Sequence, residues 1–172
     1  MKKALLVIDA QEDFIGEQRS KKKFDYENDI DELIDNINKS IELYYNSKDE
    51  VIYIAHVLSS SYINKKFIGY GIAGSEGAKI NEKIKIVSEN YFEKQTQNAF
   101  KNNNLVKFIR ENKINEVEIV GCDACGAVSS TAKAAVELGL KVSVMRNATA
   151  TINEEKFIKL SSKLKGFGVA YI

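Results

Sequence analysis

The sequence contains few of the side chains that bind soft metals or form disulfides. It has two cysteines, Cys122 and Cys125, and a single histidine, His56. A structural zinc site built from such residues needs four ligands, which this chain cannot supply. A Cys-x-x-Cys pair can also be a redox motif, but redox pairs open a helix, whereas this pair spans the expected end of a strand. The sequence therefore predicts neither a bound metal nor a redox-active dithiol.

The chain also lacks an excess of charge and a long apolar run. It has 25 lysines and arginines against 24 aspartates and glutamates, so no basic surface is expected to attract a polyanion, and we expect no nucleic-acid partner. The first apolar run, residues 4–8, is too short for a signal peptide. No run approaches the length of a membrane span. We therefore expect a cytoplasmic protein with no membrane partner.

What the sequence does contain is a regular alternation of apolar runs and amphipathic segments. A length of 172 residues with 44% hydrophobic content is enough for one domain with a sizeable core, and we assign residues 1–172 to a single domain. The alternation predicts an α/β fold, a doubly wound parallel sheet of about six strands with helices on both faces. The expected strands are 4–8, 51–57, 91–94, 117–121, 140–145 and 167–171, and the expected helices are 28–45, 100–112, 127–138 and 153–165, with a short helical turn at 81–86.

Three of the expected strands end in polar residues or in a tight turn. Asp9 follows the first strand, Lys94 ends the third, and residues 123–127 connect the fourth to a helix. Because the carboxyl ends of parallel strands meet at one edge of a sheet, a carboxylate, an ammonium and the N–H groups of a helix terminus should converge there. Such N–H groups stabilise an oxyanion, and a nucleophile on the same turn would stand at position 127, which is alanine. Each feature alone has a plainer explanation, because aspartates form turns and caps and most lysines are solvated.

Residues 59–90 form the least regular part of the chain. Several glycines interrupt this stretch, and long loops in compact domains often act as lids or subunit contacts. We expect residues 11–14 to form a loop after the first strand. His56, at the end of the second strand, is interpreted as a packed or loop-anchoring histidine rather than a substrate contact.

Several segments resemble the motifs of the isochorismatase-like (cysteine) hydrolases, a family that includes nicotinamidase and several amidohydrolases. The opening A-L-L-V-I-D-A-Q-E-D-F resembles the D-x-Q-x-D-F start of that family, and Y-F-E-K-Q-T-Q-N-A-F resembles its lysine segment. The run V-G-C-D-A-C-G-A-V-S-S-T-A-K-A-A resembles its nucleophile turn, and G-S-E-G-A-K-I resembles its glycine-rich segment. The resemblance covers nearly the whole chain in the right order, and it implies a Rossmann-like hydrolase fold.

The resemblance also implies which residues form the active site. It places the catalytic aspartate at Asp9, the catalytic lysine at Lys94 and the nucleophile at Ala127. It places the oxyanion hole at the backbone N–H groups of Asp123 and Ala127, with a cis peptide bond between Cys122 and Asp123.

The remaining implications concern the substrate pocket, metals and partners. Phe14 stands where family members place an aromatic wall of the pocket. Nicotinamidases of the family hold a metal through an Asp-x-His pair and further histidines, whereas this chain has only His56. The resemblance therefore implies a metal-independent enzyme with no cofactor, acting on a small molecule and forming a homo-oligomer.

The alanine at position 127 departs from the family pattern. Using Cys125 instead would break the match at three downstream positions, Val128, Thr131 and Ala132. One explanation is that a cysteine was deliberately replaced, which would make the chain an inactive variant of a cysteine hydrolase. The other is a natural absence, as in isochorismatases, which cleave a vinyl ether without a thiol and use the aspartate as an acid. We favour the first because the surrounding turn resembles that of thiol-bearing members.

These considerations leave three hypotheses about function. The leading one is a cysteine hydrolase that cleaves an amide-type C–N bond of a small molecule through a thioester intermediate. The second is a vinyl-ether hydrolase of the isochorismatase type. The third is a family member that binds a small molecule without turnover or serves as an assembly subunit. A cysteine placed at position 127 would discriminate between them.

Overall fold

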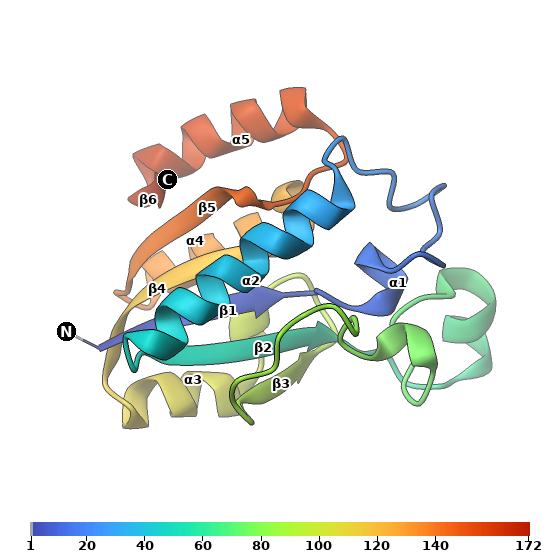
Figure 1. Ribbon diagram of the computed structural model, residues 1–172, viewed down its shortest axis with the longest axis horizontal. Helices are drawn as coiled ribbons and strands as arrows, with labels where there is room; N and C mark the ends of the chain where they lie inside the picture. The colour runs from blue at the N-terminus through green and yellow to red at the C-terminus, as the bar shows by residue number, and fades with distance from the viewer. Residues whose placement is uncertain (1) are drawn as a thin grey trace.

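The computed structural model describes residues 2–172, which form a six-stranded sheet with helices on both faces (Figure 1). The strands are all parallel and lie in the order β3-β2-β1-β4-β5-β6. The order reverses between β1 and β4, which is the point where open α/β sheets bind ligands. The prediction of a doubly wound parallel sheet is confirmed. The strands are β1 (Lys2–Ile8), β2 (Glu50–His56), β3 (Tyr91–Lys94), β4 (Ile114–Gly121), β5 (Lys141–Thr149) and β6 (Val169–Tyr171).

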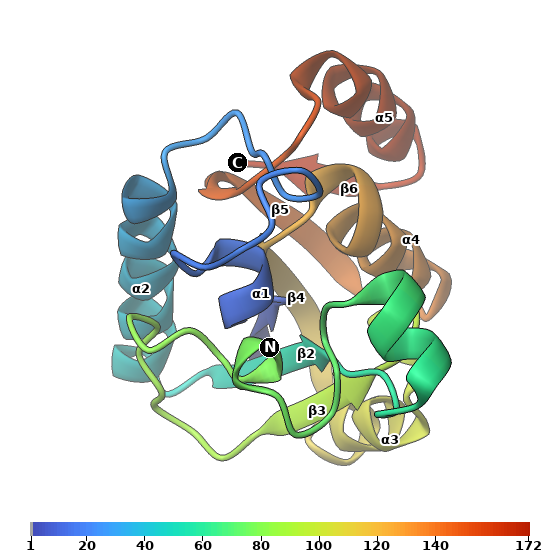
Figure 2. The same cartoon turned by 90° about the vertical axis from the view of Figure 1, so that its right-hand side faces the viewer.

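The helices divide unequally between the two faces of the sheet. Figure 2, which looks at the carboxyl edge of the strands, shows α2 (Ile30–Asn46) on one side and three helices on the other. Those three are α3 (Asn103–Glu111), α4 (Ser129–Glu137) and α5 (Glu154–Gly166). A separate apolar core fills each side of the sheet. The face of α2 is completed by loop residues, including Tyr26 and Ile84.

Helix α2 forms because its sequence supplies a hydrogen-bond acceptor for a free N–H of the first turn and apolar side chains for the buried face. The Asp29 side chain accepts a hydrogen bond from the N–H of Glu32 at 2.9 Å and so caps the helix. Apolar side chains recur every three or four residues and form one buried stripe. Its buried residues are Leu33, Ile34, Ile37, Ser40, Ile41 and Tyr44.

At the carboxyl edge of the sheet, the last residues of strands β1 and β4 lie very close together. Gly121 has a φ of +113°, and a Cβ placed there would lie 2.0 Å from the carbonyl oxygen of Ile8. Only glycine fits this backbone conformation and this distance. The chain after β4 is thereby brought directly beside the end of β1.

Two local predictions were wrong. Residues 11–14 were expected to form a loop, but Glu12–Ile15 form the short helix α1. Residues 81–86 were expected to be helical, but they form a turn in which the Asn81 carbonyl accepts from the N–H of Ile84 and its side chain accepts from the N–H of Lys83. An asparagine that bonds to nearby backbone in this way competes with helix formation.

Other elements differ from the prediction at their ends. The expected helix 100–112 begins instead with a 3-10 turn, Ala99–Lys101, after which Asn102 caps α3. Strand β5 extends beyond the expected 140–145 because, after a register shift, Thr149 pairs with Gly121. The residue after this extension, Ala150, bonds to the start of the turn that follows β4: its N–H donates to the Gly121 carbonyl, and its carbonyl accepts from the N–H of Ala124.

The irregular stretch after β2 contains a π-helical turn, Asn64–Ile68, and a 3-10 turn, Glu76–Ala78. The first of these projects from the carboxyl edge of the sheet (Figure 1). Among residues 2–172, no helix is both long and apolar enough to span a membrane.

Candidate functional site

Asp9 and Lys94 meet at the carboxyl edge of the sheet. Asp9 follows β1 and Lys94 ends β3, so the intervening strand β2 separates them in the sheet. The Lys94 Nζ donates a hydrogen bond to Asp9 Oδ2 at 2.7 Å. The prediction that this carboxylate and this ammonium converge at one edge of the sheet is confirmed, while their catalytic roles stay a prediction.

The burial of this pair determines its chemistry. Asp9 is 3% exposed and Lys94 is 4% exposed, although most lysines in proteins are solvated. Burial raises the pKa of the Asp9 carboxyl, Lys94 opposes this, and the result is a pKa of about 6. Asp9 Oδ1 is buried and makes no hydrogen bond of ordinary geometry with residues 2–172, although the nearby main chain of His56 also lowers the carboxyl pKa. One oxygen is thus held by the lysine, and a carboxyl with a pKa of about 6 can gain or lose a proton near neutral pH.

A sharp turn leads from β4 into α4 beside Asp9. The Cys122 N–H donates to the Ile8 carbonyl at 3.0 Å, and the next peptide bond, Cys122–Asp123, is cis, as the family resemblance implied. Asp123 then caps a π-helical turn, Ala124–Val128, by accepting from the N–H of Cys125 at 3.2 Å. Ala127 lies on this turn and is 6% exposed. Ala127 thus follows β4, the strand that adjoins β1, and its role as the nucleophile position stays a prediction. The expected helix 127–138 starts within a π-helical turn.

Neither natural thiol has the surroundings of a nucleophile. Cys122 is fully buried, its Sγ lies 3.2 Å from the main-chain oxygen of Asp9, and burial raises the pKa of its thiol above the ordinary value. The Sγ of Cys125 lies 3.5 Å from Thr151 Oγ1 and 3.7 Å from the Asn153 carbonyl, in the segment after β5. Burial raises the pKa of that thiol as well. A reactive cysteine needs a lowered pKa, so neither Cys122 nor Cys125 fits the role of a nucleophile.

Aromatic rings line the region around the end of β2. The buried ring of Phe14 lies 5.6 Å from Tyr70 and 4.8 Å from Phe24, measured between ring centroids, and meets His56 edge-on at 6.2 Å. Burial and the nearby Lys94 lower the pKa of His56 to about 4, so the imidazole is neutral at pH 7. His56 packs among aromatic rings, and the role of Phe14 as a pocket wall stays a prediction.

Sequence reasoning missed two residues near the site. The hydroxyl of Tyr26 is buried close to the Cys122 thiol. The side chain of Gln11 is fully buried against the end of β2. Tyr26 stands in a polar loop that gave no signal, whereas Gln11 stands inside the D-x-Q-x-D-F motif and was not assigned a role.

Within residues 2–172, no three side chains of histidine, cysteine, aspartate or glutamate come together as a metal site would require. The expectation of a metal-independent site stays a prediction.

Comparison with known proteins places this geometry in a family. The model of the isochorismatase domain matches residues 3–164. An uncharacterized isochorismatase family protein of Bacillus subtilis (strain 168) is 31% identical over 152 residues, which cover 87% of this chain and 74% of that protein.

Solved structures share the fold over nearly the full length. N-carbamoylsarcosine amidase from Thermoplasma acidophilum aligns with a TM-score of 0.80 and 23% identity over 99% of this chain and 95% of that one. Nicotinamidase/pyrazinamidase from Bacillus subtilis aligns with a TM-score of 0.84 and 23% identity over 99% of both chains. At this identity the structures show a shared fold, and the family match shows more: the chain belongs to the isochorismatase family.

Proposed function

We propose that the protein is a hydrolase of the cysteine type that cleaves an amide-type C–N bond of a small molecule, and that the chain is an inactive variant because Ala127 occupies the nucleophile position. The observation that carries the proposal is the buried Asp9–Lys94 pair, in which Asp9 Oδ1 makes no hydrogen bond of ordinary geometry within residues 2–172. Membership of the family supports it, as does a fold shared with an amidase and a nicotinamidase.

In the thiol-bearing form, Asp9 would accept the proton of a cysteine at position 127 through its free oxygen. The thiolate would attack the carbonyl carbon, and the N–H groups of residues 123 and 127 would hold the oxyanion. Asp9 would return its proton to the departing amine or ammonia, and water would then hydrolyse the thioester. Lys94 would keep the charge of Asp9 and of the thiolate balanced.

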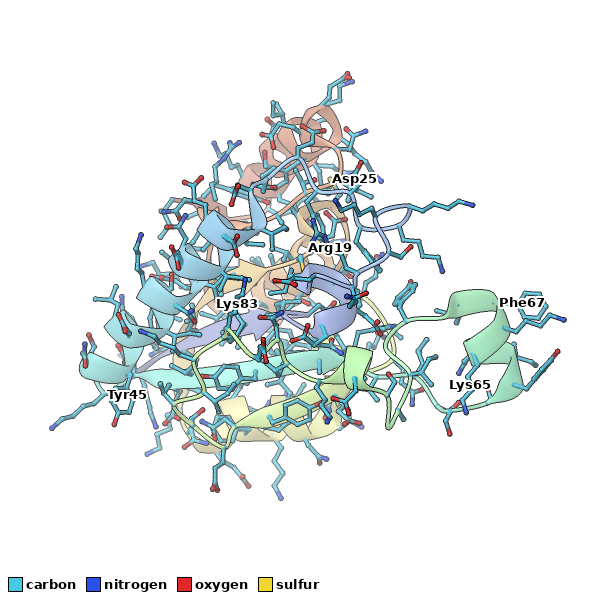
Figure 3. The ribbon with its side chains drawn as sticks, turned by 45° about the vertical axis from the view of Figure 1, so that its right-hand side comes forward. Arg19, Asp25, Tyr45, Lys65, Phe67 and Lys83 are labelled. Carbon is cyan, nitrogen blue, oxygen red and sulfur yellow. The ribbon has the colours of Figure 1, made fainter. Side chains whose placement is uncertain are left out.

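The proposal includes the setting in which the site works. The site is carried by a single domain, residues 1–172, that acts in the cytoplasm without metal or cofactor and forms a homo-oligomer. Support for a subunit contact comes from the projecting segment on which Figure 3 labels Lys65 and Phe67, because Tyr62, Ile63 and Phe67 are largely exposed there. Support for a substrate-binding role of Phe14 comes from its ring cluster with Tyr70.

A second candidate function is hydrolysis of a vinyl ether by the chain as it stands. The observation that favours it is the Asp9 carboxyl itself, since a buried acid with a pKa of about 6 and a free oxygen can donate a proton without any thiol.

Placing a cysteine at position 127 tests both candidates. We expect Ala127→Cys to hydrolyse members of a panel of small carboxamides and ureido compounds, and Ala127→Ser to serve as a control with similar size but no ready thiolate. The cysteine should also react with iodoacetamide faster than Cys122 or Cys125. Turnover of a vinyl ether by the unsubstituted chain would favour the second candidate. Absence of turnover of either substrate class by the folded variants would contradict both.

A further inference from the structure

The buried side chain of Gln11 binds the last residue of β2 from both sides. Its Oε1 accepts a hydrogen bond from the His56 N–H at 2.6 Å, and its Nε2 donates to the His56 carbonyl at 3.0 Å. The same Nε2 donates to the carbonyl of Ala78 at 2.7 Å. Gln11 is fully buried, so one carboxamide satisfies three main-chain groups, two on His56 and one on Ala78.

The end of β2 needs such a partner because strand β1 leaves the sheet at this level. The last bond of that ladder runs from the Asp9 N–H to the Ile54 carbonyl at 2.8 Å, and Asp9 then turns away with a φ of +50°. The N–H and carbonyl of His56 point to the side that β1 has left, since the N–H of the next residue, Val57, already faces β3. Gln11 replaces the missing strand, which prevents two buried main-chain groups from remaining unpaired.

This contact is connected directly to Lys94. His56 is the residue of β2 that is in register with Lys94 in β3, and the Val57 N–H donates to the Lys94 carbonyl at 2.9 Å. The main-chain position of His56 therefore sets the position of the Lys94 backbone, from which its ammonium reaches across to Asp9.

The same contact holds a segment against the strand end. Gln11 binds Ala78, and Asp13 Oδ2 accepts from the N–H of Gly71 at 2.8 Å, so both ends of residues 71–78 are fastened. Gly71 itself lies against His56, because a Cβ placed there would come within 2.7 Å of the His56 carbonyl. We call residues 71–78 the roof segment.

We infer that Gln11 is a positioning residue, which holds the end of β2 and the roof segment so that Lys94 stays buried against Asp9. The positioning of Lys94 is a statement about geometry, whereas its consequence for turnover rests on the proposed function. Gln11 itself does not touch the reacting atoms in this scheme.

The test uses Gln11→Met, which keeps the shape of the side chain and removes all three hydrogen bonds. Asn38→Leu is the matched control, because the Asn38 carboxamide likewise joins two main-chain groups, the carbonyl of Lys83 and the N–H of Lys85, without touching β2. The first measurement is acetylation of Lys94 by acetic anhydride, followed by peptide mass spectrometry with exposed Lys101 as the internal reference. We expect Lys94 acetylation to rise on the order of tenfold in Gln11→Met, because local opening exposes it, and to stay unchanged in Asn38→Leu.

A second measurement is turnover in the Ala127→Cys background. We expect kcat to fall between about tenfold and a hundredfold in the added Gln11→Met variant, as a small displacement of a catalytic group can cost that much, while KM stays within about threefold. A role in general stability alone would not separate kcat from KM in this way. If Ala127→Cys shows no turnover but Lys94 acetylation rises, the positioning role stands and the proposed function fails.

Two outcomes would overturn the inference. One is a folded Gln11→Met whose Lys94 is as resistant to acetylation as in the unsubstituted chain. If Gln11→Met does not fold, Lys94 acetylation is measured in Gln11→Glu instead. That variant keeps an oxygen that can accept from the His56 N–H, but it loses the two hydrogen bonds that Nε2 donates. The other outcome needs no variant. In the unsubstituted chain the His56 N–H should be as strongly protected from amide hydrogen exchange as the N–H of Ile54. Rapid exchange at His56 would show that Gln11 does not hold the end of β2.

Discussion

Replacing Lys94 by methionine should change the protonation state of Asp9 at neutral pH. Methionine nearly fills the space of the lysine but carries neither charge nor a hydrogen-bond donor. Burial raises the pKa of Asp9 to about 6 even with Lys94 present, because the lysine only partly offsets the loss of solvation. Without the lysine, the carboxylate would be buried and unpaired, so Asp9 should keep its proton instead.

The size of the effect follows from the contact. The Nζ–Oδ2 distance is 2.7 Å, and both groups are shielded from solvent. A hydrogen bond between charged groups in such a place contributes about 3 kcal/mol, which corresponds to roughly a hundredfold change in the proton affinity of Asp9. Asp9 is mostly ionised at pH 7 in the native chain, and in Lys94→Met it should be mostly protonated.

The free energy of unfolding should follow the same titration. The pKa of Asp9 is 3.8 in the reference state and about 6 in the fold, so the folded chain binds the proton more tightly between these values. Stability is therefore highest below this interval and falls as the pH rises through it, by about 3 kcal/mol in all. In Lys94→Met the decline should continue above pH 7, because the carboxyl ionises later.

Carboxyl ¹³C NMR of aspartate-labelled protein measures this titration, with Asp9 assigned by its absence in Asp9→Asn. Urea unfolding between pH 4 and pH 9 measures the stability. Lys101→Met is the control, since Lys101 is exposed and close in sequence, and it should leave both titrations unchanged. The double variant Asp9→Asn with Lys94→Met should lose the pH-dependent decline that belongs to Asp9. An Asp9 midpoint in Lys94→Met that stays at about 6 or falls would refute the assignment of the buried charge pair.

Three further predictions concern the surroundings of the site. The single imidazole of His56 should titrate with a midpoint of about 4 in proton NMR, because burial and Lys94 disfavour its charged form; a midpoint near 6.5 would contradict this environment. Gly121→Ala should cost about 4 kcal/mol or more of unfolding free energy, because its Cβ would meet the Ile8 carbonyl. Gly139→Ala, at a φ of +82° with nothing within 4 Å, should cost only about 1 kcal/mol, and equal losses in urea unfolding would argue against the clash. A disulfide-exchange reagent should modify half-buried Cys125 well before fully buried Cys122 in the native chain, and equal rates would mean that the turn opens.

The sequence by itself determined the class of the fold and the positions of most elements. Strand β1 and helix α2 could be predicted because their apolar spacing is a local property, read over a few residues at a time. The motif at residues 9–14 and the turn after β4 are also continuous stretches of sequence. The family resemblance could therefore predict a catalytic role for Asp9 and the nucleophile role for position 127 without any tertiary contact. The ends of elements were less predictable, as Asn81 and Asn102 show, because side-chain bonds to nearby backbone decided them.

Only the tertiary structure decided how these residues act together. It buried Lys94 against Asp9 and brought Gln11 to His56 across 45 residues of chain. Such contacts depend on strand order and register, which join segments that no sequence window contains. The pKa of a carboxyl depends on the solvent removed from it and on the charges placed beside it. Because both are set by distant parts of the chain, the chemistry of Asp9 belongs to the fold as a whole.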